Sequence, residues 1–128
     1  MHGSKGEQSK AIAAFTATIR FDPRHVVAYI ARGMIYTDIG DFDKAIADYS
    51  EIVRLTPGSA EVYDVRAAIY TKKGDLDKAI ADWTEAIRLN PRFAHAFYER
   101  GVAYDKKGEK SKAEADFAQA KKLGYKAP

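Results

Sequence analysis

Hydrophobic positions recur along this chain at helical spacing, in segments separated by short polar turns. Tyr63, Ala67 and Tyr70 follow one another at i, i+4 and i+7, which places them on one face of a helix. After the next turn a second apolar face contains Leu76, Ala79, Ile80, Trp83, Ala86 and Ile87. The same alternation continues on both sides and predicts helices near residues 8–21, 26–39, 42–55, 60–73, 76–89, 94–107 and 110–123.

The residues between these segments are typical of helix ends. Gly74 is expected to end one helix because glycine adopts the left-handed conformation at little cost. Asp75 is expected to cap the next helix by accepting backbone N–H bonds. Pro91 is expected to end that helix, since a proline disfavours helical geometry in the residue before it.

Four classes of residue repeat at the same interval of 34 positions. The prolines are Pro23, Pro57 and Pro91, and the glycines are Gly6, Gly40, Gly74 and Gly108. Alanines occur at Ala11, Ala45, Ala79 and Ala113, and large aromatics at Phe15, Tyr49, Trp83 and Phe117. A period of this length indicates stacked supersecondary units that bury a continuous core between neighbours.

This pattern resembles the tetratricopeptide repeat, a helix–turn–helix unit whose signature runs large aromatic, Gly or Ala, Tyr, Gly, Ala, aromatic, Ala, Pro. The middle unit supplies Tyr63, Ala67, Tyr70, Gly74, Ala79, Trp83, Ala86 and Pro91. The resemblance covers about residues 6–125. It implies an all-α fold, a right-handed superhelical α-solenoid of antiparallel helix pairs with about seven helices.

The chain is expected to contain three full repeats, at residues 26–59, 60–93 and 94–128. Residues 6–25 match only the second helix of a unit, and residues 1–5 are expected to be a cloning remnant or a disordered start. Ile12, Phe15 and Ile19 are then expected to lack part of their partner surface. The alternatives are that this helix frays or self-associates, or that it packs on the next unit with one side in water.

The last helix departs from the pattern at its outer face. Lys110, Glu114 and Lys121 stand where earlier second helices carry apolar residues, and Tyr125 replaces the proline. A polar outer face is what a terminal capping repeat needs. The sequence therefore predicts a natural C-terminal end.

An arginine and an aspartate recur sixteen residues apart in every full unit. The pairs are Arg32 with Asp48, Arg66 with Asp82, and Arg100 with Asp116. The spacing predicts a salt bridge from the first to the second helix of each unit. A partly buried, bidentate bridge would specify register more than it stabilises.

Composition narrows the function without identifying it. The chain has 128 residues, no cysteine and a formal charge of +3, which excludes disulfides and thiolate chemistry and provides no strong basic excess for nucleic acid. No segment is long and apolar enough for a membrane span. We expect a cytoplasmic protein, or a periplasmic one if a signal peptide has been removed.

Candidate catalytic and metal-binding residues are few. His95 and Glu99 are spaced i, i+4, but no third ligand is in view, so a metal site is not expected. His25 is interpreted as a turn residue beside Pro23. The glycines follow the repeat rather than a phosphate-binding loop. We expect neither an enzyme nor a cofactor.

The resemblance implies a concave groove lined by first helices that binds another protein or a peptide. Its positions map onto Val27, Ile30, Ala31, Met34, Thr37 and Asp38 in the first full unit. The second unit contributes Glu61, Asp64, Val65, Ala68, Thr71 and Lys72, and the third contributes His95, Tyr98, Glu99, Val102, Asp105 and Lys106. Helical spacing independently separates Ile30 and Met34 from the core face.

The chemistry of these positions predicts a partner with apolar residues at one end and Lys or Arg at the other. Met34 tolerates varied partners, and Tyr98 is a plausible anchor. Some members of the family bind an acidic C-terminal tail through a carboxylate clamp of Lys, Asn and Arg. The matched positions here are Ile30, Met34, Val65, His95 and Glu99, so that type of recognition is not expected.

Two alternatives to a protein-binding module stay open. An RNA-binding helical repeat is suggested by lysines at the inter-helix turns, namely Lys72, Lys73, Lys106 and Lys107. The acidic groove positions weigh against nucleic acid. A self-assembly unit, a dimer for example, would join through the incompletely covered N-terminal half repeat.

Overall fold

The structure is a computed structural model that describes residues 4–126. This part of the chain is helical and connected by short turns, with no strand. Each predicted helix is present, and its ends agree with the expectation to within one residue except at the first start. The helices are α1 (Lys5–Phe21), α2 (Val26–Asp38), α3 (Phe42–Leu55), α4 (Ala60–Lys73), α5 (Leu76–Leu89), α6 (Ala94–Lys106) and α7 (Lys110–Lys122).

Helix α1 begins three residues earlier than the apolar pattern indicated because a polar residue caps it. The Ser4 hydroxyl accepts a hydrogen bond from the backbone N–H of Glu7 at 3.2 Å. Ser4 and Lys5 therefore belong to the cap and the first turn. The rest of the predicted remnant, residues 1–3, lies outside the described residues.

Aspartate and glycine mark several other helix ends, Gly74 and Asp75 among them as the sequence predicted. The carboxylates of Asp41 and Asp75 cap α3 and α5 by accepting from the backbone N–H three residues on, at 3.4 and 3.2 Å. Gly74 has a φ of +94° directly after α4. That conformation closes the turn and is one that other residues rarely adopt.

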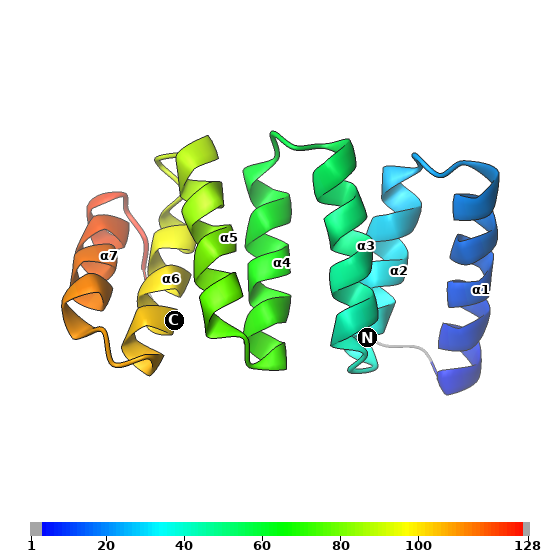
Figure 1. The fold of residues 1–128 in the computed structure, drawn as a ribbon, viewed down its shortest axis with the longest axis horizontal. Helices are drawn as coiled ribbons and strands as arrows, with labels where there is room; N and C mark the ends of the chain where they lie inside the picture. Colours follow the sequence, from blue (N-terminus) through cyan, green and yellow to red (C-terminus); the bar gives the residue numbers. More distant parts are fainter. Residues whose placement is uncertain (1–3, 127–128) are drawn as a thin grey trace. The chain divides into compact units, whose positions relative to one another are not determined.

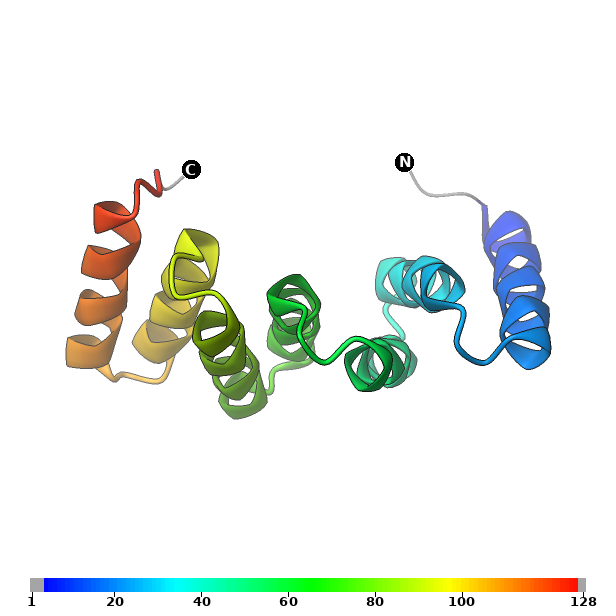
Figure 2. The same cartoon turned by 90° about the horizontal axis from the view of Figure 1, so that it is seen from above.

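The chain divides into two compact units, residues 1–57 and 58–128, which are described separately. In the first unit α2 packs on both α1 and α3 (Figures 1 and 2). Its buried residues include Tyr29, Tyr49 and Ile52. Gly33 lies against the Tyr49 ring, where an added Cβ would stand 2.7 Å from Cε2. Glycine thus permits the close approach of α2 and α3.

In the second unit α4, α5, α6 and α7 pack in order, each on the next (Figure 1). Its core consists of small residues around one large ring, namely Ala60, Ala67, Ala79, Trp83, Ala86, Ala96 and Ala103. Small side chains allow neighbouring helix axes to approach, and Trp83 fills the space between them.

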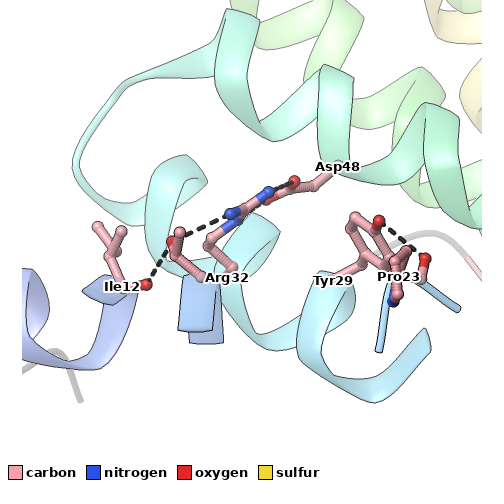
Figure 3. A network of polar contacts seen from close by, with 6 residues as sticks. Ile12, Pro23, Tyr29, Arg32 and Asp48 are labelled. Atoms are coloured by element: carbon pink, nitrogen blue, oxygen red, sulfur yellow. Dashed lines mark hydrogen bonds and ion pairs between the residues drawn. The ribbon is translucent and has the colours of Figure 1, made fainter. Parts of the chain in front are cut away.

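The predicted arginine–aspartate bridge is confirmed in all three repeats. Figure 3 shows the first: Arg32 donates from Nε and Nη2 to the two carboxylate oxygens of Asp48, at 3.0 and 2.6 Å. Arg66 and Asp82 are joined in the same bidentate way at 2.8 and 2.7 Å. Arg100 completes the set, with both bonds to its aspartate at 2.8 Å.

These bridges are largely removed from water. The aspartates are buried, and each arginine side chain is 17% exposed. Hydrogen bonding to Asp48 raises the pKa of Arg32 above its ordinary value, against the opposing effect of burial. Each guanidinium also lies within about 6 Å of two ring centroids, Tyr29 and Tyr36 in the first repeat. The bridge is therefore part of a packed polar and aromatic layer.

Arg32 and Arg100 each also contact the helix before their own. Arg32 Nη1 donates to the Thr16 hydroxyl of α1 at 3.0 Å, and that hydroxyl donates to the Ile12 carbonyl at 2.7 Å (Figure 3). In the second unit Arg100 Nη1 donates to the Thr84 hydroxyl of α5 at 3.1 Å. One side chain thus connects three consecutive helices.

The first helix of the series is less covered than the others, and the last one has a polar outer face. Helix α1 packs on α2, yet none of its residues is fully buried. Ile12, Phe15 and Ile19 are half-buried, as expected for a helix that lacks a first-helix partner. At the other end of the series the outer positions of α7 are exposed, at Lys110, Glu114 and Lys121.

Candidate functional site

Helix α2 exposes apolar side chains on the face opposite its core contacts. Val27 is 67% exposed and Met34 is 56% exposed, although the same helix buries Tyr29 and Gly33. The other predicted positions on this helix are half-buried at Ile30, Ala31 and Thr37, and exposed at Asp38. This face can contact a partner without any change to the core.

Helix α4 carries the second set of predicted residues. Glu61, Val65 and Lys72 are exposed. Ala68 and Thr71 are half-buried, and the Thr71 hydroxyl donates to the Ala67 carbonyl at 3.1 Å. The exposed part of this helix therefore carries one acidic residue (Glu61), one basic residue (Lys72) and the aliphatic Val65 between them.

Asp64, a predicted groove residue, already has two partners inside the second unit. Its Oδ1 accepts a hydrogen bond from the Trp83 indole N–H at 2.8 Å. The same oxygen lies 3.1 Å from His95 Nδ1. Asp64 thus orients the Trp83 ring from α5 and the His95 ring from α6, a structural task that repeat spacing alone did not reveal.

Helix α6 carries the third set. His95 is exposed, Asp105 accepts from the Lys110 ammonium at 2.6 Å, and Glu99 and Val102 are half-buried. Lys106 is exposed. Tyr98 is not open to a ligand on all sides: its ring stacks on Tyr125 with centroids 4.6 Å apart.

Two features had no signal in the repeat pattern. Tyr125 stands where the other repeats have a proline, and its contact with Tyr98 could not be read from that position. Phe21, at the end of α1, is 93% exposed, and Ile39, after α2, is 48% exposed. His25, interpreted as a turn residue, caps α2 by accepting from the Ala28 N–H at 3.1 Å.

Among the lysines that suggested RNA binding, Lys107 contacts carboxylates. All four are exposed. The Lys107 ammonium, however, donates to Asp77 and lies 3.9 Å from the Glu109 carboxylate. The hydrogen bond to Asp77 raises the pKa of Lys107. A phosphate backbone would have to compete with these carboxylates.

Between residues 4 and 126 no three His, Asp or Glu side chains gather as they would around a metal ion. No described helix combines the length and apolar character needed to cross a membrane.

Sequence comparisons identify the repeat directly. Tetratricopeptide repeat families match residues 4–60 and residues 94–123, and a family described as TPR repeat matches residues 67–108. Together these matches cover most of the chain. No curated protein sequence matches significantly.

Solved structures share the fold. A crystal structure of MamA is 31% identical with a TM-score of 0.84, and the match covers 94% of this chain and 70% of that one. A second MamA crystal structure is also 31% identical, with 65% of its length covered, so this chain spans about two thirds of MamA. MamA from Desulfovibrio magneticus RS-1, at 21% identity and a TM-score of 0.82 over 92% of this chain and 67% of that one, shows the fold alone.

A further neighbour is a complex. The second TPR of Spaghetti (RPAP3), bound to the HSP90 peptide SRMEEVD, is 26% identical with a TM-score of 0.71 and covers 79% of this chain and 94% of that one. These neighbours support the predicted all-α solenoid and a protein-interaction module. The repeat signature, the three family matches and the MamA structure agree, and the chain belongs to the tetratricopeptide repeat family.

Proposed function

We propose that this chain is a non-catalytic interaction module and that each unit binds partner side chains on the exposed faces of its own first helices, α2 in the first unit and α4 and α6 in the second. The observation that carries the proposal is the exposure of Val27, Met34 and Val65 on helices whose opposite faces are buried. Apolar side chains gathered on one helix face commonly mark an interaction site.

The α2 face would supply the apolar part of the contact. Burying a valine or methionine side chain contributes about 1.5–3 kcal/mol when exposure is lost completely. Val27 and Met34 are both more than half exposed, so each retains a sizeable part of that contribution for a partner. Met34 can adjust its rotamer to different side chains.

The faces of α4 and α6 would supply charge selection. Glu61 and Asp105 are exposed, and Glu99 is half-buried. These carboxylates favour Lys or Arg in the partner segment, and the attraction weakens with added salt. Lys72 and Lys106 on the same helices would limit how many basic residues the segment contains.

Selection from a random peptide library displayed on phage tests the proposal. We expect enriched peptides that combine aliphatic side chains with one or two Lys or Arg residues. Met34→Asp should weaken the selected peptides about tenfold or more, since a lost apolar contact of about 1.4 kcal/mol corresponds to that factor. Titration calorimetry with one synthetic peptide would measure the change.

The matched control is Ala47→Asp, which places the same charge at an exposed position of α3 in the same unit and should leave affinity unchanged. The acidic peptide SRMEEVD, bound by the RPAP3 repeat domain, provides a second comparison. We expect it not to bind here, because the clamp positions hold Ile30, Met34, Val65, His95 and Glu99. Equal loss in Met34→Asp and Ala47→Asp, or selection of acidic peptides, would contradict the proposal.

A further inference from the structure

The segment after α7 turns back toward α6. Gly124 has a φ of +94°, and its N–H donates to the Lys121 carbonyl at 2.9 Å. The N–H of Tyr125 donates to the Ala120 carbonyl, also at 2.9 Å. Backbone bonds of this kind satisfy the helix end without any side chain. The Tyr125 side chain is therefore not needed to close the turn.

That side chain stacks on an aromatic cluster. Tyr125 stacks on Tyr98 with centroids 4.6 Å apart and planes 26° apart. Behind Tyr98 lies Phe117 of α7, at a centroid distance of 5.5 Å. The Tyr125 ring is itself one wall of a hollow whose other walls are Tyr98, Phe117, Ala120 and Lys121. The contact surface thus suits a flat ring.

The surroundings of the Tyr125 hydroxyl are partly desolvated. Burial raises the pKa of Tyr125, and the nearby Glu99 carboxylate raises it further. The His95 ring is 6.2 Å from the Tyr125 ring. Next to the Glu99 carboxylate, a neutral phenol is therefore a better occupant than an acidic side chain.

Repeat spacing shows that Tyr125 is not required by the fold of a unit. The positions 34 and 68 residues earlier are Pro91 and Pro57, both exposed turn residues. The ring that Tyr125 covers, Tyr98, corresponds to Ile30 and Asp64 in the other repeats. The stacked pair is therefore particular to the last repeat.

We propose that the Tyr98 ring, with Phe117, Ala120 and Lys121 beside it, is a stacking site for an aromatic side chain, called the pocket below, which Tyr125 occupies in cis and which an aromatic residue of a partner peptide takes when Tyr125 leaves. That the outside occupant is a peptide rests on the proposed function; the pocket itself does not. Because the Tyr125 ring must first leave, the apparent affinity for an outside ligand is the intrinsic affinity multiplied by the fraction of time that the pocket is free.

The test uses p-cresol, which is the tyrosine side chain as a free molecule, and the variant Tyr125→Ala. NMR signals of labelled Tyr98 and Phe117 report occupancy of the pocket. We expect saturable shifts in the variant at concentrations about tenfold lower than in the wild-type chain, as a stacked aromatic pair of about 1.4 kcal/mol would predict. Equal binding to both chains, or no binding to the variant, overturns the proposal.

Two controls separate a vacated pocket from a damaged fold. Tyr125→Phe should behave as the wild-type chain, because the ring remains. Tyr98→Ala combined with Tyr125→Ala should lose p-cresol binding while the far-ultraviolet circular dichroism stays helical. Binding that survives in the double variant places p-cresol elsewhere and contradicts the pocket.

A peptide arm links the pocket to the proposed function. Peptides selected on the Tyr125→Ala chain should contain an aromatic residue more often than those selected on the wild-type chain. If p-cresol binds the variant but no peptide depends on Met34, the pocket stands and the groove proposal fails. If peptides depend on Met34 but p-cresol does not bind the variant, the groove proposal stands and the pocket fails.

Discussion

Arg32 binds side chains of two other helices at the same time. Its guanidinium binds the Asp48 carboxylate through two nitrogens and the Thr16 hydroxyl through the third. Five fixed donors in one plane permit this division, which a lysine could not reproduce. The aspartate is buried, so the arginine also prevents an isolated charge from being trapped in the interior.

Replacing Asp48 by asparagine should therefore destabilise the first unit. The change keeps the shape of the side chain but removes the charge opposite a guanidinium that is mostly buried. We expect a loss of about 2–3 kcal/mol in the free energy of unfolding, measured by urea denaturation. The exposed Glu51–Arg54 pair of the same helix is the comparison, and Glu51→Gln should cost less than about 1 kcal/mol. Similar losses in both variants would count against a special role for the buried bridge.

Gly33 offers a second prediction at this scale. An alanine there gains about 1 kcal/mol of helix propensity. Its Cβ, however, would stand 2.7 Å from Tyr49 Cε2, and overpacking of this kind costs about 1–3 kcal/mol. We expect a net loss of stability of about 1 kcal/mol for Gly33→Ala in urea denaturation.

Gly6, also in a helix, is the matched control for that substitution. The nearest atom to an added Cβ there is Ser4 Oγ at 3.9 Å. Gly6→Ala should therefore stabilise α1 by up to about 1 kcal/mol, with no packing cost to offset it. If both alanines stabilise the chain equally, the Tyr49 ring yields freely and the close packing is not limiting.

At the scale of helices, turn residues and apolar spacing were sufficient to predict almost every helix end. Asp75 caps α5 and Gly74 adopts a positive φ, both as the sequence indicated. Periodicity also predicted the Arg–Asp bridges, since a pair that recurs in three units is visible without coordinates. These features could be predicted because they repeat.

What could not be predicted belongs to positions where the repeats differ. Asp64 has no carboxylate counterpart at the matched positions, and its bonds to Trp83 and His95 depend on side-chain rotamers. Tyr125 contacts Tyr98 across a turn that occurs once. The predicted groove included Asp64 and Tyr98 as open positions, because a pattern of positions carries no information on which side chains already contact one another.

Helix α7 lacks a cap that its counterparts possess. Asp41 and Asp75 accept from the backbone three residues on, whereas Glu109 at the matched position makes no such bond. Glu109→Asp should create it and stabilise α7 by about 0.5–1 kcal/mol in thermal or urea unfolding. The exposed pair between Glu109 and Lys112 at 3.4 Å reduces the gain only slightly. The reverse change, Asp75→Glu, should destabilise the chain by a similar amount; the idea fails if both changes have the same sign.

For the molecule as a whole, stability should vary along the repeat series. Helix α5 buries Trp83, but the buried residues of α7 are only Ala113, Asp116 and Ala120. Because local opening costs least where little apolar surface is covered, amide hydrogen exchange in α7 should be at least about tenfold faster than in α5. Mass spectrometry of exchanged peptides measures this within one unit. Equal protection in α5 and α7 would show that the second unit opens only as a single body.

The threonine hydroxyls that accept a hydrogen bond from arginine Nη1 affect how a longer series of these repeats should be designed. Thr16 and Thr84 receive a guanidinium from the following first helix, and the corresponding residue of α7 is Ala118. A tandem duplication of residues 60–93 would therefore supply each new copy with an acceptor for its successor. A copy of the last repeat would supply none, so an extended array should be built from the middle module, or from the last one only after Ala118→Thr.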